Sequence, residues 1–122
     1  MPMAKVTLAA GLLMTAAALA NPPAAYAMPT DGNWSVLIIT EKGSCDRAYR
    51  YTVNVSHGRL VYEGSAPVNF TGAVAANGRI KVSIKAGSQG ASGSGRLSGS
   101  AGAGTWRSSA GECAGRWEAE RR

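Results

Sequence analysis

Residues 77–85 read Asn-Gly-Arg-Ile-Lys-Val-Ser-Ile-Lys, and this stretch carries the clearest β-hairpin signal in the chain. An Asn-Gly pair supplies the positive φ angles that a tight two-residue hairpin requires. Apolar and polar residues then alternate, which places Ile80, Val82 and Ile84 on one face and the charged residues on the other. Period-two alternation is typical of a strand with one buried face. The sequence therefore predicts a hairpin turn followed by a half-buried β-strand.

The same alternation extends over the chain beyond residue 27. Segments of alternating residues are separated by turn residues such as His57-Gly58. The segments are 34–39, 49–56, 60–62, 68–74, 80–85, 91–98, 104–106 and 113–119. No stretch keeps a 3.6-residue period, so we expect almost no helix. The spacing predicts an all-β domain, an up-and-down antiparallel meander of seven or eight strands. Closure into a small barrel would remove exposed sheet edges, and a sandwich is the open alternative.

Residues 87–104 have a different composition, almost entirely Gly, Ser and Ala. A flexible linker is one interpretation of such a segment. Alternation persists through it, however, because Ala91, Gly93 and Leu97 fall on one face. Small residues inside a strand let a neighbouring backbone or a large side chain come close. We therefore favour a strand that leaves room for the three tryptophans.

The first 27 residues have the pattern of an export signal. Lys5 gives a positive start, residues 6–20 are apolar, and Ala25-Tyr26-Ala27 matches a cleavage site for signal peptidase. The alternative is a membrane anchor, but the apolar run is at the short limit for a span and ends in a helix breaker. We predict a signal peptide at 1–27, a single domain at 28–122 without a membrane span, and a secreted or periplasmic protein.

The chain has two cysteines, Cys45 and Cys113, which are 68 positions apart. Export would deliver both to an oxidising compartment, where a cysteine pair favours a disulfide over a metal half-site. A bridge across a loop of that length stabilises a fold by about 4 kcal/mol in the chain-entropy model. We predict one disulfide that ties the early chain to its last strand.

Beyond residue 27 the chain carries twelve basic and seven acidic residues, a net charge of +5. Such a balance biases encounters toward anionic surfaces without selecting one. Arg79, Lys81 and Lys85 share the outward face of one predicted strand and form a candidate anion-binding surface. The alternative, which we favour, is that they keep this strand soluble. No aromatic residue alternates with them to stack bases, which argues against nucleic acid.

Few residues could carry catalysis. His57 is the only histidine and falls at a predicted hairpin tip, so no second histidine can join it in a metal site. No serine lies in a G-x-S-x-G elbow, and the one near match to G-x-G-x-x-G lacks its last glycine. Glu118 and Glu120 share a strand face, where nearby Arg116 and Arg121 predict surface ion pairs. We expect no enzymatic activity, metal or cofactor.

Gly32 and Trp34 form a G-x-W pattern at the start of the first predicted strand. It resembles the pattern that opens small calycin barrels, the lipocalin and avidin group. The resemblance implies that Trp34 plugs one end of a barrel beneath an arginine from the final strand, either Arg116 or Arg121. The pattern is also similar to that of bacterial protease-inhibitor barrels, which are exported, carry one disulfide and act through their N-terminal trunk and loops.

A further resemblance runs from Gly32 to Trp117 and covers nearly all of the predicted domain. It is to uncharacterised small exported proteins of proteobacteria, and it brings no activity with it. The shared patterns are G-x-W, G-x-C, G-S-G-x-L-S-G and C-x-G-x-W, at residues 32–34, 43–45, 93–99 and 113–117.

These observations predict a non-enzymatic exported binding module. Its partner would be a protein, an envelope component or a small apolar ligand. Trp34, Trp106 and Trp117 are the candidate aromatic residues for a barrel end or a cavity wall. The alternative is an inhibitor of a protease or lysozyme, and an enzyme is the third and weakest hypothesis. A hollow, aromatic-lined interior would favour a ligand, whereas a packed interior would argue against one.

Overall fold

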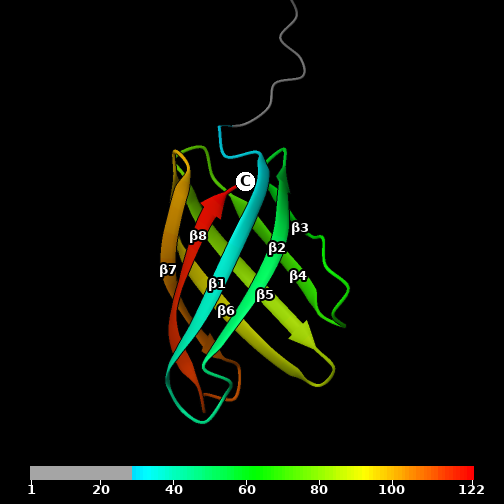
Figure 1. The fold of residues 1–122 in the computed structure, drawn as a ribbon, viewed down its shortest axis with the longest axis vertical. Helices are drawn as coiled ribbons and strands as arrows, with labels where there is room; N and C mark the ends of the chain where they lie inside the picture. The colour runs from blue at the N-terminus through cyan, green and yellow to red at the C-terminus, as the bar shows by residue number, and fades with distance from the viewer. Residues whose placement is uncertain (1–28) are drawn as a thin grey trace, which may run out of the picture.

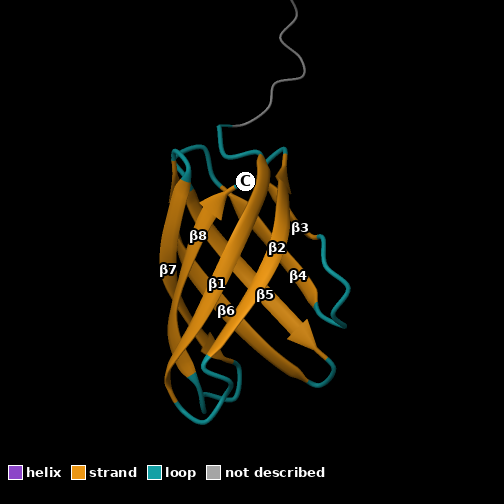
Figure 2. Cartoon of the chain, in the orientation of Figure 1, coloured by secondary structure: helices purple, strands orange, loops and turns teal. Residues whose placement is uncertain are grey.

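A computed structural model describes residues 29–122. The predicted signal peptide, residues 1–27, lies outside the described residues. The described chain forms eight β-strands (Figures 1 and 2). Their bounds are β1 Gly32–Lys42, β2 Ala48–Ser56, β3 Arg59–Tyr62, β4 Asn69–Val74, β5 Arg79–Ala86, β6 Gln89–Ser98, β7 Ala101–Ser108 and β8 Ala114–Arg121. None of residues 29–122 belongs to a helix that is long and apolar enough to cross a membrane.

The eight strands close into one barrel. Each strand pairs antiparallel with the next one along the chain, and β8 returns to pair with β1. This arrangement confirms the predicted all-β, up-and-down meander, and it shows that the domain is a barrel and not a sandwich. Closure pairs every strand with two neighbours and so leaves little free sheet edge, which suits a small exposed domain.

Alternation sorts side chains between the interior and the outer surface as the sequence predicts. On β5, Ile80 is buried and Val82 and Ile84 are half-buried, while the charged residues between them are exposed. β1 differs because both of its faces are apolar. Trp34 and Ile38 are buried inside the barrel. Ser35, on the outer face, is also buried, and its hydroxyl accepts a hydrogen bond of 2.8 Å from the guanidinium of Arg50.

The Gly, Ser and Ala segment is part of the barrel, so the linker interpretation is wrong. Residues 87–104 contribute all of β6 and the first half of β7, joined by a tight turn at Gly99 and Ser100. The sequence predicted one strand here and a short one at 104–106; the structure has two long ones. Gly99 adopts a φ of 62°, in the left-handed region that glycine occupies without strain.

One joint of the barrel is short. β3 and β4 share a single register pair, Arg59 with Ala73, and residues 63–68 loop away beyond it. The aromatic rings of Tyr62 and Phe70 stack across the gap, with centroids 5.3 Å apart. Ring packing thus covers the interior where ladder hydrogen bonds end.

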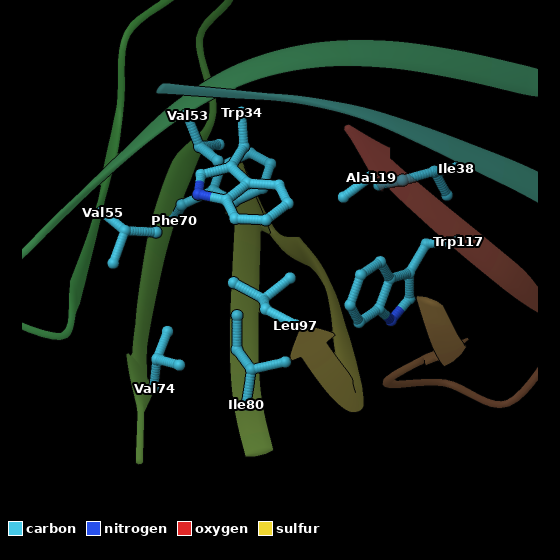
Figure 3. Packing of buried hydrophobic residues seen from close by; sticks show 10 residues of the cluster. All are labelled: Trp34, Ile38, Val53, Val55, Phe70, Val74, Ile80, Leu97, Trp117 and Ala119. Atoms are coloured by element: carbon cyan, nitrogen blue, oxygen red, sulfur yellow. The ribbon is translucent and has the colours of Figure 1, made fainter. Parts of the chain in front are cut away.

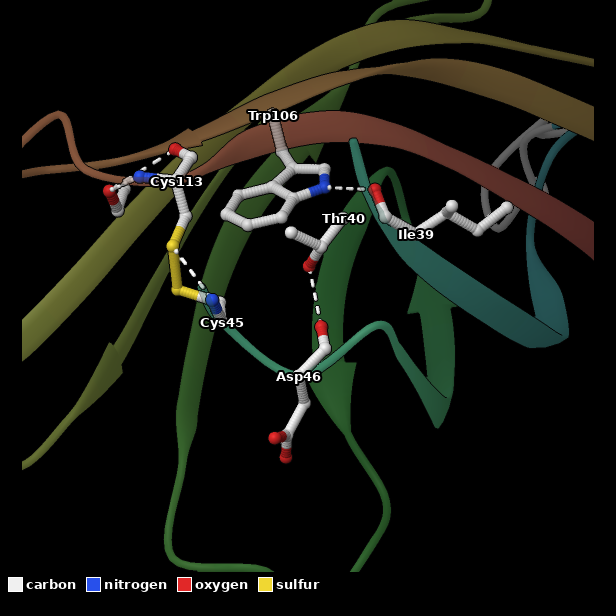
Figure 4. The surroundings of a disulfide bond; sticks show 7 residues. Ile39, Thr40, Cys45, Asp46, Trp106 and Cys113 are labelled. Carbon is white, nitrogen blue, oxygen red and sulfur yellow. Dashed lines mark hydrogen bonds between the residues drawn. A yellow bond between two sulfur atoms is a disulfide. The ribbon is translucent and has the colours of Figure 1, made fainter. Parts of the chain in front are cut away.

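The predicted disulfide between Cys45 and Cys113 is present, with the two Cα atoms 6.2 Å apart. It joins the β1–β2 loop to the residue that precedes β8, at the lower end of the barrel in Figure 1. Figure 4 shows the ring of Trp106 beside this bridge. A disulfide and the lack of a spanning helix among residues 29–122 are compatible with an exported protein.

Candidate binding cavity

One end of the barrel is closed by Trp34. Its side chain is 1% exposed, and its indole N–H donates a hydrogen bond of 3.0 Å to the backbone carbonyl of Thr30. The guanidinium of Arg121, from the last strand, lies over the ring at 4.8 Å from the centroid. The structure therefore selects Arg121, and not Arg116, as the arginine that covers the tryptophan.

Backbone carbonyls hold Arg121 in place. Its guanidinium donates hydrogen bonds to the carbonyl oxygens of Asp31, Pro29 and Gly99, the last two at 2.8 and 3.1 Å. Gly32 has a φ of 134°, and a Cβ at this position would lie 3.0 Å from an Arg121 nitrogen. The glycine of the G-x-W pattern thus gives the arginine room, while the tryptophan provides the surface on which it lies.

The nearby β2–β3 hairpin is fastened to the same end. The carboxylate of Asp31 accepts hydrogen bonds from the backbone N–H groups of His57 and Gly58, at 3.0 and 3.1 Å. His57 has a φ of 52° and Gly58 a φ of 78°, the positive values that a tight hairpin turn needs. His57 is exposed at the hairpin tip, as predicted, and contributes its backbone rather than its ring.

Tight packing continues inward from Trp34. Figure 3 shows Trp34 close to Val53 and Phe70, with Leu97 and Ile80 below them. All of these side chains are buried. The closed end of the barrel is therefore a packed hydrophobic core.

Toward the other end the interior is hollow. A cavity of about 500 Å³ extends from this core to the open end of the barrel. Val36, Val82, Ile84 and Trp106 point inward, yet they are only half-buried because open space lies beside them. Ligand pockets commonly have volumes of about 300 to 1,000 Å³ and predominantly apolar walls. This cavity has the size and the walls to hold a small apolar molecule.

Glycines shape the wall beside β8, where β7 pairs with it and β6 follows. A Cβ at Gly95 or Gly104 would lie 2.6 Å from the ring of Trp117, so only glycine lets this ring lie flat against β6 and β7. The Trp117 indole N–H donates a hydrogen bond of 3.2 Å to the carbonyl of Ser94. The small-residue segment thus seats a tryptophan and lines the cavity at the same time.

Trp106 lies nearer to the open end. Its indole N–H donates a hydrogen bond of 3.0 Å to the carbonyl of Ile39 (Figure 4). Gly115 is its neighbour on β8, where a Cβ would lie 1.9 Å from the Ile39 carbonyl oxygen. All three indole N–H groups are thus bonded to backbone carbonyls, and they leave an apolar surface toward the cavity.

Tyrosines form a second part of the cavity wall. Tyr51 stacks with Tyr49 at 6.1 Å between centroids and meets Tyr62 and Phe70 edge-on. Burial raises the pKa of the Tyr51 phenol above its ordinary value of 10.0, and the neighbouring phenols of Tyr49 and Tyr62 raise it further. The phenol of Tyr51 is therefore neutral at physiological pH, and the wall carries no charge there.

Polar residues gather at the mouth of the cavity. Ser88 comes from the β5–β6 turn, Gln89 from the start of β6, and Ser109 and Glu112 from the β7–β8 loop. The Cys45–Cys113 bridge holds one side of this rim. Gly43, with a φ of 95°, makes the close approach of the two bridged loops feasible, since a Cβ there would lie 2.1 Å from the carbonyl oxygen of Glu112.

The remaining predicted residues lie on the outer surface. Arg116 pairs with Glu41 at 2.8 Å and with Glu118 at 3.5 Å, and the hydrogen bond that its guanidinium donates to Glu41 is the main reason for its raised pKa. The surface ion pair predicted for Arg116 is therefore present. The one predicted for Arg121 is wrong, because that side chain lies over Trp34.

Arg79, Lys81 and Lys85 are exposed on the outer face of β5, as the alternation predicts. They do not line the cavity. Within residues 29–122, no three His, Cys, Asp or Glu side chains are close enough together to hold a metal ion.

The chain matches no family model, no curated protein and no solved structure. The calycin and proteobacterial resemblances therefore stay predictions, and the function has to be argued from the cavity itself.

Proposed function

We propose that this protein is an exported, non-catalytic binding protein that holds a small apolar molecule inside its barrel. The observation that carries the proposal is the cavity of about 500 Å³, closed at one end by Trp34 and Arg121 and open at the other. A filled interior would have stabilised the fold more, because each methylene-sized void costs about 1 kcal/mol. A hollow this large is best explained by an occupant.

The walls indicate the chemistry of that occupant. They combine branched aliphatic side chains such as Val36 and Ile84 with the rings of Trp106, Trp117 and Tyr51. Polar residues lie mainly at the mouth. A molecule with an apolar body and, at most, one polar end directed toward the mouth fits this distribution. The open end and the disulfide fit a carrier that works in an oxidising compartment, either secreted or periplasmic.

The test is a titration of the purified protein with N-phenyl-1-naphthylamine, an uncharged probe that fluoresces in apolar surroundings. We expect saturable binding with a Kd of about 10 µM, the affinity that apolar contacts of a molecule this size supply. Tryptophan emission should be quenched in parallel, because three indole rings line the cavity. Displacement by alkanols of increasing chain length then measures how much of the cavity is used.

Two substitutions at one position give a matched control. Val82 lines the cavity between Gly72 and Gly93 on the neighbouring strands. Val82→Phe fills the space and should weaken probe binding about tenfold, whereas Val82→Ala enlarges it and should keep affinity within about threefold. Absence of saturable binding, or equal losses in both variants, would overturn the proposal. Inhibition of secreted proteases or lysozymes that Val82→Phe leaves intact would favour the inhibitor alternative instead.

A further inference from the structure

Charge is segregated around the barrel. From Gly64 to Gly111 the sequence contains no Asp or Glu, and this range includes β4, β5, β6 and β7. Five basic residues fall in the same range, and all five are exposed. They are Arg79, Lys81, Lys85, Arg96 and Arg107. Because β4 to β7 are consecutive in the barrel, half of its outer wall carries positive charge alone.

None of these five cations has a carboxylate partner within residues 29–122, where the ion pairs all involve Arg116. Arg79 and Arg96 are direct neighbours across β5 and β6. Like charges in that position destabilise a sheet. A surface that serves solubility alone needs no such pair, whereas a bound anion would offset the repulsion.

The same face has a groove. A shallow depression of about 630 Å³ crosses β4 to β7. The register places Thr71, Ser83, Ser92 and Arg107 in one row across the four strands. A parallel row contains Lys81, Ser94 and Thr105. The groove is therefore lined by short hydroxyl side chains, with a lysine and an arginine among them.

We infer that this outer groove is a second binding site, distinct from the cavity, and that it binds an acidic polysaccharide along its length. Ammonium and guanidinium groups pair with the carboxylates of such a chain, and the serine and threonine hydroxyls exchange hydrogen bonds with its sugar hydroxyls. Neighbouring strands lie about 4.8 Å apart, so the rows offer regularly spaced contacts to an extended polymer.

Two other polyanions fit the face less well. The large apolar side chains that are exposed among the described residues, Tyr49 and Val61, lie on β2 and β3. Trp106 and Val82 border the groove, but both are half-buried and pack against the interior of the barrel. The groove therefore offers no exposed ring on which nucleic acid bases could stack and no exposed apolar side chain that would insert into a lipid surface.

The test measures retention of the purified protein on immobilised polygalacturonate at about 20 mM salt, where surface charges are weakly screened. Dextran, which is uncharged, serves as the reference matrix. We expect retention on polygalacturonate only, and its loss as salt is raised. The double variant Lys81→Gln/Arg107→Gln should bind about tenfold more weakly, since two ion pairs are removed.

A charge-matched control removes two cations from elsewhere. Arg47→Gln/Arg59→Gln lowers the net charge equally but lies outside the groove, so it should retain binding within about twofold. Ser83→Asp, at a serine that lines the groove but not the cavity, adds a carboxylate without removing a cation and should also weaken binding. N-phenyl-1-naphthylamine binding should be unchanged in all these variants, which separates this site from the cavity.

Several results would overturn the inference. They are absence of retention, equal losses in the groove and control double variants, tighter binding to single-stranded DNA, and tighter binding to phosphatidylglycerol vesicles. The last two would assign the groove to a nucleic acid or to a lipid surface.

Discussion

The two ends of this barrel are stabilised in different ways. At the closed end, Trp34 and Arg121 fill the lumen, and backbone carbonyls accept every hydrogen bond that their side chains donate. At the open end, the Cys45–Cys113 bridge joins two loops, whereas the β5–β6 turn across the mouth is held by backbone hydrogen bonds and no covalent bridge. The difference separates two requirements, because packing at one end stabilises the fold and leaves the other end free to stay hollow.

The largest expected effect is at the closed end. Trp34→Ala should lower the free energy of unfolding by about 4 to 5 kcal/mol, because a fully buried ring is lost where the surrounding core cannot collapse. Urea unfolding followed by circular dichroism measures the loss. Trp106→Ala, at the half-open end, should cost roughly half as much because its ring is only half-buried. Equal costs would contradict the contrast between the ends.

Removal of the bridge tests the open end. Cys45→Ala/Cys113→Ala should lower the free energy of unfolding by about 4 kcal/mol through the entropy of the unfolded chain. Wild-type protein measured in reductant should show the same loss, and reductant should leave the variant unaffected. A loss under about 1 kcal/mol would show that the bridged loops do not constrain the unfolded chain as the 68-residue separation implies.

The arginine of the closed end provides a third comparison. Arg121→Met should cost about 2 kcal/mol, since three carbonyls lose a donor and the ring contact loses its cation. Arg116→Met removes only an exposed ion pair and should stay within about 0.5 kcal/mol. Thermal unfolding of the two variants at pH 7 is sufficient to compare them. A larger loss of stability in Arg116→Met than in Arg121→Met would contradict the role of Arg121 at the closed end.

The smallest effect concerns pH and the wall of the cavity. Burial, followed by Tyr49 and Tyr62, raises the pKa of Tyr51 in the folded protein, so the folded state favours the neutral phenol. The contribution of this phenol to stability is therefore complete below about pH 10 and is lost as pH rises through its folded-state pKa. We expect the Tm of wild type to fall more steeply above pH 10 than the Tm of Tyr51→Phe.

Tyr49→Phe is the control for that measurement. It leaves the buried phenol in place and removes a lesser cause of the shift, so most of the pH dependence should remain. Identical profiles for wild type and Tyr51→Phe between pH 8 and pH 11 would refute the assignment.

Strand parity in the sequence distinguishes Arg121 from Arg116. Arg121 has the same strand parity as Trp117 and Ala119, which face inward, whereas Arg116 has the opposite parity. Alternation alone could have chosen between them. In the same way, the lack of acidic residues from 64 to 111 would have added Arg96 and Arg107 to the basic surface predicted from Arg79, Lys81 and Lys85.

Other parts of the site had no such signal. Tyr62 and Phe70 lie on segments that were predicted as strands, but their stacking depends on the short β3–β4 joint. The β3–β4 pairing is short because residues 63–68 leave the sheet after Tyr62, and the alternation of residues does not predict where a strand leaves its neighbour. The small residues of the predicted strand 91–98 were expected to leave room for the tryptophans. Only the register across β6, β7 and β8 shows that Gly95, together with Gly104, makes room for Trp117.

The strands and the face on which most side chains lie could be predicted from the sequence, because period-two alternation and turn residues act locally. The cysteine pair could be predicted as well, since the chain has only two cysteines. The pairing of β8 with β1, the packed lumen at Trp34 and the open space beside Trp106 became clear only in the folded barrel. The physical reason is that a barrel's closure and inner volume depend on strand number and stagger, which bring together side chains from strands that are distant in the sequence.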